Sequence, residues 1–359
     1  MIVVMRIGAS EADIADVIEA IEKEGGKAYV DRGVERVVIG VRTDRHDLSP
    51  DAFRMLHGVE DVIRVSKPYK MASREFHPSD TVFTVRGVTF GGKQVVIIAG
   101  PCSVESEEQI MAAARAAKAA GAHVLRGGAF KPRSSPYSFQ GLGEKGLLLL
   151  AEAGRETGLP VITEVMHPRH IDLVAAYADI LQVGARNMQN FDLLKELALL
   201  HKPIMLKRGM AASLEELLLS AEYILAGGYG EIILCERGIR TFETATRNTL
   251  DISAVPVIKS LSHLPVAIDP SHAAGTAQYV PSLSLAAIAA GADALMVEMH
   301  PDPATAKSDG LQSLTPQAFA DMVVQCRRVA EAIGRSLSLI HISEPTRLLS
   351  ISYAVFCLK

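Results

Sequence analysis

From residue 95 onward the chain repeats one pattern, a short apolar run followed by a longer amphipathic segment. The apolar runs lie at 95–100, 123–128, 160–165, 179–184, 203–208, 231–236, 265–269 and 294–298. Runs that are apolar throughout their length are typical of strands buried on both faces of a parallel sheet. Eight strand–helix units predict an α/β fold with a (β/α)8 TIM barrel. An open doubly wound sheet is less consistent, because no GxGxxG follows the first run.

The first 70 residues have a different pattern, which reads β-α-β-β-α-β. A helix is expected to begin at Ser10, with Asp13 three residues further on, and to end at Gly25 and Gly26. Residues 80–92 then predict a hairpin. We therefore expect an α+β ferredoxin-like domain at 1–72 and a barrel at 73–335, with 73–94 forming a linker and the hairpin.

The C-terminal segment interrupts the helical pattern of residues 316–335. Residues 336–347, "SLSLIHISEPTR", resemble the translation of a transposase adapter used in sequencing libraries. We therefore expect residues 336–359 to be a non-native tail and exclude them from the predicted fold.

Composition and charge narrow the classes of function. The 359 residues are 48% hydrophobic and 22% charged, which is ordinary for a globular protein. The net charge of −4 gives no general attraction to nucleic acid or to acidic membranes. Four cysteines without a CxxC pair make a disulfide framework unexpected and favour the cytoplasm. The N-terminal residues resemble neither a signal peptide nor a membrane span.

Cations follow the ends of several predicted strands, and the carboxyl ends of barrel strands meet at one rim. These residues are Arg126, Lys131 and Arg133 after the second run, Arg186 after the fourth, Lys207 and Arg208 at the fifth, and Arg237 and Arg240 after the sixth. Converging cations repel one another unless an anion offsets them, so they predict a polyanionic ligand, most plausibly a phosphate. Two separate groups, around Lys131 and around Lys207, leave room for two phosphorylated substrates.

A second set of residues is expected at the same rim. Cys102, His272, Glu298 and Asp309 follow the first, seventh and eighth runs. A thiolate, an imidazole and two carboxylates suit a divalent cation such as Zn, Mn or Fe(II) better than Mg or Ca. Each residue taken alone has an ordinary structural explanation, and sequence spacing does not fix a site assembled from three strands. Position alone therefore leaves both interpretations open. Cys235 and Cys326 are interpreted as core residues.

Several motifs together resemble 3-deoxy-D-arabino-heptulosonate 7-phosphate (DAHP) synthase. They are "GPCSVES" (100–106), "RGGAFKPRSSPYSFQGLG" (126–143), "VGARNMQNF" (183–191), "KPIMLKRGM" (202–210), "CERGIRTF" (235–242), "DPSHAAG" (269–275) and "MVEMHPDPATAKSDGLQSL" (296–314). The resemblance covers the barrel, and the front domain resembles the regulatory extension of one subgroup of the family. A related family, 3-deoxy-D-manno-octulosonate 8-phosphate synthase, typically has an Asn-containing "KANRSS" where this chain has residues 131–135.

The resemblance implies roles for particular residues. Cys102, His272, Glu298 and Asp309 would ligate a divalent metal of the Mn, Fe, Zn or Co class. Phosphoenolpyruvate would be held by Arg126, Lys131, Arg186, Lys207 and Arg237, with help from the Ala185 backbone. Erythrose 4-phosphate would be received by Lys131, Arg133 and Ser134. Lys131, Cys102 and His272 would be the catalytic residues, and Glu164 is our own candidate for assisting the addition of water.

The expected reaction is the condensation of phosphoenolpyruvate with erythrose 4-phosphate and water, the first step of the shikimate pathway. One alternative is an enzyme resembling 3-deoxy-D-manno-octulosonate 8-phosphate synthase. Another is a Schiff-base aldolase with Lys131 or Lys207 as the nucleophile. A third is a ligand sensor built on a degenerate barrel. The resemblance also suggests feedback by tyrosine or phenylalanine through the front domain, and a homotetramer.

Overall fold

The computed structural model describes residues 1–32, 36–43, 48–63, 68–131, 135 and 137–337. The chain forms two compact units, Met1–Lys70 and Met71–Lys359, which are described separately. Within the described residues, no helix combines the length and the apolar character that crossing a membrane requires.

The front unit is a four-stranded antiparallel sheet with two helices. Its elements are β1 (Ile2–Met5), α1 (Glu11–Lys23), β2 (Lys27–Arg32), β3 (Val37–Arg42), α2 (Pro50–Arg54) and β4 (Val59–Ile63). The strand order β2-β3-β1-β4 confirms the predicted ferredoxin-like arrangement. Ser10 and Asp13 form a capping box at the start of α1. Ile14, Val17 and Ile21 of α1 are buried in the core of this unit.

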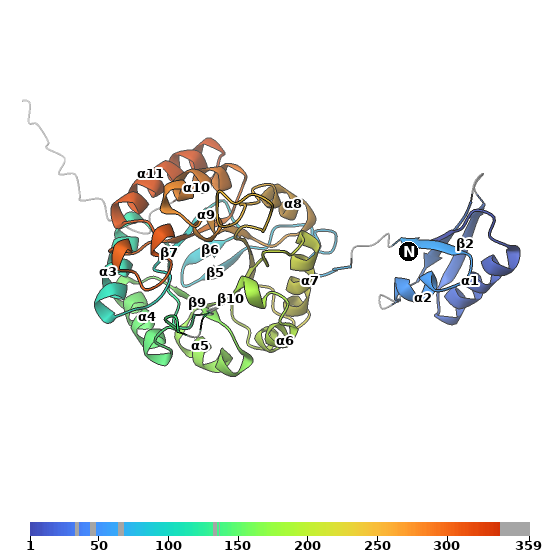
Figure 1. Ribbon diagram of the computed structural model, residues 1–359, viewed down its shortest axis with the longest axis horizontal. Coiled ribbons are helices and arrows are strands. Elements are labelled where there is room, and N and C mark those ends of the chain that lie inside the picture. Colours follow the sequence, from blue (N-terminus) through green and yellow to red (C-terminus); the bar gives the residue numbers. More distant parts are fainter. Residues whose placement is uncertain (33–35, 44–47, 64–67, 132–134, 136, 338–359) are drawn as a thin grey trace, which may run out of the picture. The chain divides into compact units, whose positions relative to one another are not determined.

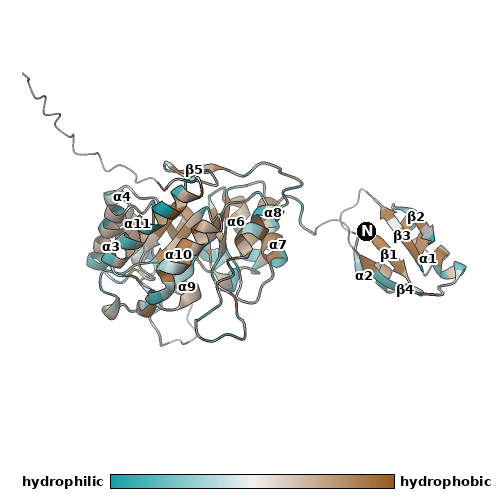
Figure 2. Ribbon diagram, turned by 90° about the horizontal axis from the view of Figure 1, so that it is seen from above, coloured by the Kyte–Doolittle hydropathy of each residue, from teal (hydrophilic) through white to brown (hydrophobic). Residues whose placement is uncertain are grey.

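The second unit is a closed barrel of eight parallel strands surrounded by helices (Figure 1), as the pattern of apolar runs predicted. The strands are β7 (Val96–Gly100), β8 (Val124–Arg126), β9 (Val161–Val165), β10 (Ile180–Val183), β11 (Ile204–Lys207), β12 (Ile232–Glu236), β13 (Val266–Ile268) and β14 (Ala294–Glu298). The helices are α3 (Glu107–Ala120), α4 (Glu144–Thr157), α5 (Ile171–Tyr177), α6 (Phe191–Leu199), α7 (Leu214–Leu225), α8 (Ala254–Leu261), α9 (Pro270–Ala274), α10 (Val280–Ala289) and α11 (Pro316–Ala332). Figure 2 shows that hydrophobic residues concentrate on the strands.

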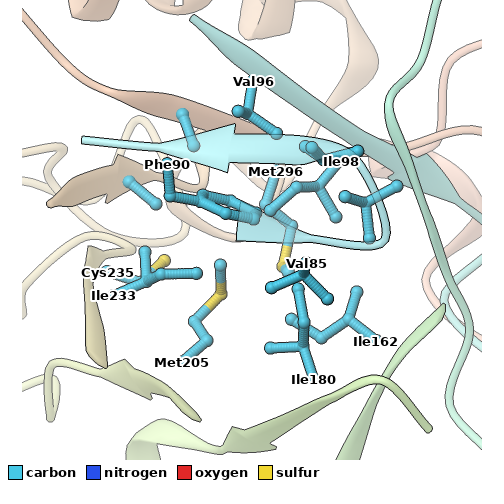
Figure 3. Packing of buried hydrophobic residues seen from close by; sticks show 14 of the residues in the cluster. Val85, Phe90, Val96, Ile98, Ile162, Ile180, Met205, Ile233, Cys235 and Met296 are labelled. Carbon is cyan, nitrogen blue, oxygen red and sulfur yellow. The ribbon is translucent and has the colours of Figure 1, made fainter. Parts of the chain in front are cut away.

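The predicted hairpin fills the amino-terminal end of the barrel. It consists of β5 (Phe83–Val85) and β6 (Val88–Phe90), and its apolar side chains join one cluster with residues from the strands. Figure 3 shows Phe90 and Val85 among Ile98, Ile180 and Met205. The other end of the barrel remains available for polar side chains, which is where the site lies.

The described part of the chain ends against the amino-terminal end of the barrel. The Ser336 amide donates to the carbonyl of Lys93 at 3.1 Å, and its carbonyl accepts from the Val95 amide at 2.7 Å. Leu337 is buried. The rest of the expected tail, residues 338–359, lies outside the described residues.

Candidate functional site

A polar cavity of about 200 Å³ lies at the carboxyl-terminal end of the barrel. Its lining comes from strand ends and the loops that follow them, and consists of Arg126, Lys131, Glu164, Gln182, Gly184, Ala185, Arg186, Lys207, Met210, Arg237, Arg240, Arg247, Asn248 and His272. All five cations that the resemblance assigned to phosphoenolpyruvate are in this lining, as is Ala185. Arg133 and Ser134 lie outside the described residues.

The cavity cations differ in how their charges are balanced. Lys207 is buried and donates to Asp269 at 2.5 Å, and Arg126 is buried and donates to Glu298 at 2.7 Å. Arg186, in the short 3₁₀ turn η2 (Ala185–Asn187), has no side-chain hydrogen bond or ion pair within the described residues. The Nε of Arg126 is buried and, over the same residues, also lacks a partner. Both arginines line the cavity, and cations with unused donors are suited to an anionic ligand.

Two glycines in the motifs allow this close packing of polar groups. A Cβ on Gly128 would lie 2.8 Å from the carbonyl oxygen of Cys102 and 2.9 Å from Cδ of Lys131. A Cβ on Gly184 would lie 2.0 Å from the Glu164 carboxylate. Side chains at these positions would therefore displace Lys131 or Glu164 from the cavity.

Cys102 lies where the predicted cation and metal groups meet. Its Sγ accepts a hydrogen bond from Lys131 Nζ at 3.0 Å, lies 2.9 Å from Ser308 Oγ and donates to Asp309 Oδ2 at 3.2 Å. Ligand atoms of Cys102, Glu298 and Asp309 all lie within 4.8 Å of one another. Three of the four predicted metal ligands are therefore close enough to bind one ion.

His272, the fourth predicted ligand, adjoins this group. Its Nε2 lies 3.4 Å from Glu298 Oε1, and its Nδ1 lies 2.7 Å from Asp269 Oδ2. A carboxylate that accepts from Nδ1 favours the tautomer with a free Nε2, which is the form that binds a metal. Thiol, imidazole and carboxylate donors thus converge from the loop after β7, from α9, and from the end of β14 and the loop that follows it. This donor set fits a borderline divalent cation.

Asp309 and Glu298 are fixed by residues to which the sequence analysis gave no role. Asp309 adopts a left-handed conformation with φ of 52°, just before the 3₁₀ turn η5 (Gly310–Gln312). Gln312 donates to Glu298 Oε2 at 2.6 Å and accepts from Arg247 at 3.0 Å. Arg247 also donates to Asp309 at 3.5 Å. These contacts link the loop after β14 to the loop after β12.

Burial and neighbouring charges set the protonation of the group. Burial raises the pKa of the Cys102 thiol to about 11, and Glu298 acts in the same direction. Burial also acts to raise the pKa of Glu298, but the charges of His272 and Arg126 outweigh it and lower that pKa. Asp309 likewise has a lowered pKa, because His272 and the hydrogen bond from Cys102 outweigh its burial. Binding of a divalent cation would therefore require the thiol to lose its proton.

Comparison with known proteins decides the family. The DAHP synthetase I family matches residues 75–333, and the DAHP synthase ferredoxin-like domain matches residues 1–67. The chain belongs to the DAHP synthetase I family. A phospho-2-dehydro-3-deoxyheptonate aldolase of Thermotoga maritima is 52% identical over 334 residues, which cover 93% of this chain and 99% of that protein.

Solved structures support the same family. The crystal structure of the Thermotoga maritima DAHP synthase has a TM-score of 0.91 at 52% identity, covering 93% of this chain and 98% of that one. A truncated form of the Thermotoga maritima enzyme matches 74% of this chain with a TM-score of 0.70 and 51% identity. A 2-dehydro-3-deoxyphosphooctonate aldolase of Syntrophobacter fumaroxidans is 32% identical over 250 residues, covering 65% of this chain and 86% of that protein.

Family membership makes the chain an enzyme, a transferase of the 3-deoxy-7-phosphoheptulonate synthase class, and it supports the aldol-type condensation of the shikimate pathway. The predicted family, fold class and enzyme class are confirmed. The roles of individual residues remain predictions.

Four residues of the site were not predicted from the sequence, although three of them lie in the quoted motifs: Asp269, Gln312, Ser308 and, outside the motifs, Arg247. Asp269 carried a usable signal, since an Asp directly before a proline predicts a helix N-cap followed by Pro at the first helical position. Its side chain accepts from the His272 amide at 3.0 Å. Nothing in the pattern of Arg247 and Gln312 indicates their contact, because it joins two loops 65 residues apart.

Proposed function

We propose that the chain condenses phosphoenolpyruvate with erythrose 4-phosphate and water to give DAHP and phosphate. The observation that carries this proposal is the direct contact between the cations of the cavity and the candidate metal ligands. Lys131 donates to Cys102 Sγ at 3.0 Å, and Arg126 donates to Glu298 at 2.7 Å. This arrangement supports a reaction in which an anionic substrate and an aldehyde meet within one cavity.

The chain's own residues would bind and orient the reactants. Arg186, Lys207 and Arg237 would hold the phosphate and carboxylate of phosphoenolpyruvate, which suits cations at a cavity wall. Lys131 Nζ would supply a proton to the alkoxide oxygen that forms from the aldehyde. Glu164, in the same lining, would assist the addition of water to the former enol carbon.

Cys102, His272, Glu298 and Asp309 would hold a divalent cation of the Mn, Fe, Zn or Co class. When bound, such an ion polarises the aldehyde oxygen and offsets the negative charge that develops on it. Asp269 would hold the imidazole of His272, and Gln312 would hold one oxygen of Glu298.

Phosphate release from phosphoenolpyruvate tests the reaction and its dependence on metal. We expect release only with an aldose phosphate present, its loss after EDTA treatment, and its return when Mn²⁺ is added. Turnover that survives EDTA, together with borohydride trapping of an adduct on Lys131 or Lys207, would instead favour a Schiff-base aldolase.

The choice of acceptor is tested by substrate competition. We expect kcat/KM for erythrose 4-phosphate to exceed that for arabinose 5-phosphate by about 100-fold. The reverse preference would favour a function like that of the 2-dehydro-3-deoxyphosphooctonate aldolases. The segment that would decide the matter, residues 131–135, lies largely outside the described residues.

We also propose that the front unit regulates the enzyme by binding tyrosine or phenylalanine. The match to the ferredoxin-like domain of DAHP synthases supports this proposal. Deleting residues 1–72 should leave catalysis in place and abolish feedback, and inhibition that survives the deletion would contradict the assignment. The match of a truncated DAHP synthase to 74% of this chain supports the use of such a deletion.

We also propose that the chain forms a homotetramer and acts in the cytoplasm. Phe191, Leu199 and Tyr223 are exposed on α6 and α7, which supports burial in an assembly. Cys102, Cys235 and Cys326 are buried free thiols, which suits a reducing compartment. Sedimentation analysis of the purified chain measures the oligomeric state.

A further inference from the structure

Asp269 is a buried carboxylate that contacts both groups of the site. It follows β13 and caps the short helix α9, where its Oδ1 accepts from the His272 amide at 3.0 Å. Its Oδ2 accepts from Lys207 Nζ at 2.5 Å and lies 2.7 Å from His272 Nδ1. Asp269 is 0% exposed, so these donors are not replaced by bulk water.

The two side-chain donors share a single oxygen atom. An oxygen that accepts from two donors at once forms a weaker hydrogen bond with each of them than it would form with one donor alone. Lys207 also lines the cavity, where a substrate anion can draw its ammonium group away from Asp269. When the hydrogen bond from Lys207 to Asp269 weakens, Oδ2 can accept a stronger hydrogen bond from the imidazole of His272.

A change in the hydrogen bond between His272 Nδ1 and Asp269 Oδ2 also affects the other nitrogen of the imidazole, which faces the metal ligands. A stronger hydrogen bond from Nδ1–H to a carboxylate makes the opposite nitrogen a better metal ligand. That nitrogen, Nε2, lies 3.4 Å from Glu298 Oε1, beside the Cys102, Glu298 and Asp309 cluster. A chain of two hydrogen bonds therefore joins Lys207 to the candidate metal site.

We propose that Asp269 is a positioning residue that couples the two sites, so that substrate anion and divalent cation each tighten binding of the other. The proposal rests on the proposed function, which supplies the two ligands. Thermodynamic linkage requires the effect to be reciprocal. Direct attraction between cation and anion adds to the coupling, so the experiment must isolate the share that passes through Asp269.

The coupling is measured by titrating the full-length chain with Mn²⁺ and following the binding by calorimetry. The titration is done once without phosphoenolpyruvate and once with saturating phosphoenolpyruvate. For the wild type we expect phosphoenolpyruvate to tighten Mn²⁺ binding by about tenfold. In Asp269→Asn this ratio should fall to about twofold, and Mn²⁺ affinity without phosphoenolpyruvate should fall by at least about tenfold. A variant that keeps the wild-type ratio would overturn the proposal.

Asp293→Asn is the matched control, because Asp293 is also a buried carboxylate with two cationic partners, Lys259 and Arg335. It faces the amino-terminal end of the barrel, and its substitution should keep the tenfold ratio. A comparable fall in this control would assign the effect to general loosening of the barrel and overturn the proposal.

Lys207→Met tests the same link if Asp269→Asn does not fold. Removing one of the two donors leaves Oδ2 to His272, so Mn²⁺ affinity without phosphoenolpyruvate should rise by about threefold. Arg186→Met removes a cavity cation that, among the described residues, does not contact Asp269, and it should raise that affinity less. Equal effects of the two substitutions would contradict the proposal. Failure of the wild type to bind either ligand would instead refute the proposed function.

Discussion

Both ends of the barrel contain cationic side chains, but these side chains differ in how many hydrogen-bond and ion-pair partners they have. At the amino-terminal end, Arg335 donates to Asp293 at 2.9 Å and to backbone carbonyls that include those of Gly291, Ala292 and Gly92. At the carboxyl-terminal end, Arg237 has only a 3.5 Å contact with the His272 carbonyl among the described residues. Over the same part of the chain, the Arg186 side chain has no hydrogen bond or ion pair.

This difference separates cations that stabilise the fold from cations that we propose to bind a ligand. A cation whose donors all have acceptors within the protein stabilises the native state without a ligand. A cation with unused donors, held among other cations, is stabilised only when an anion arrives. Burial lowers the pKa of Arg237, which is the expected consequence of desolvation with insufficient compensation.

The apolar groups follow the same division. Phe83, Val85, Val88 and Phe90 of the hairpin fill the amino-terminal end of the barrel, whereas the carboxyl-terminal end contains a polar cavity. The hairpin therefore lies at the end of the barrel opposite the candidate site. Substitutions at the two ends should therefore separate stability from activity.

The largest effect is expected at the amino-terminal end, from Arg335→Met. This substitution leaves Asp293 with one cationic partner and leaves several carbonyls without a donor, so we expect a loss of about 3 kcal/mol of stability. For a barrel of this size, such a loss lowers Tm by roughly 6–12 °C, measured by scanning calorimetry. Arg328→Met, an exposed control on the same C-terminal segment, should change Tm by less than about 2 °C.

Activity per folded molecule should be retained in Arg335→Met. A large fall in kcat at a temperature well below Tm would contradict the assignment of Arg335 to structure alone.

Arg186→Met should have the opposite profile. Loss of a charge-assisted contact to the substrate should lower kcat/KM for phosphoenolpyruvate by about 100-fold, which corresponds to about 3 kcal/mol. Because Arg186 has no ion pair within the described residues, its removal should leave Tm unchanged to within about 2 °C. Steady-state kinetics and calorimetry on the same preparation test both halves of the prediction. A lowered Tm with unchanged kinetics would show that Arg186 stabilises the fold and does not bind the substrate.

The sequence predicted the barrel because its strands are buried on both faces and therefore read as continuous apolar runs. The rim residues were predictable for a related reason, since the topology of a barrel brings the ends of distant strands together. Cys102 thus meets Glu298 and Asp309 in the structure although it lies about 200 residues before them in the chain.

Pairings that depend on side-chain direction were not predictable in this way. Arg335 and Asp293 are 42 residues apart, and no periodicity relates them. The sharing of Asp269 Oδ2 by Lys207 and His272 depends on two rotamers and on the turn into α9. The place of the hairpin in the barrel also requires tertiary packing, because its own pattern indicates only two short strands.

The smallest expected effect concerns a histidine at the amino-terminal end. His263 Nε2 lies 2.8 Å from the carbonyl of Met71 and its Nδ1 lies 2.5 Å from Thr81 Oγ1. Burial lowers its pKa, with contributions from His77 and Arg74 that outweigh Asp80, while the Met71 carbonyl acts in the opposite direction.

Because the folded pKa lies below the unfolded value, the unfolded chain takes up this proton more readily. The contribution of His263 to stability is therefore complete above about pH 6.5 and is lost as the pH falls toward the folded pKa. His263→Gln removes this titration. The decrease in Tm between pH 7.5 and pH 5.5 should thus be smaller in the variant than in the wild type, by about 2 °C. An equal decrease in both proteins would assign the acid sensitivity to other groups, such as the carboxylates at the carboxyl-terminal end.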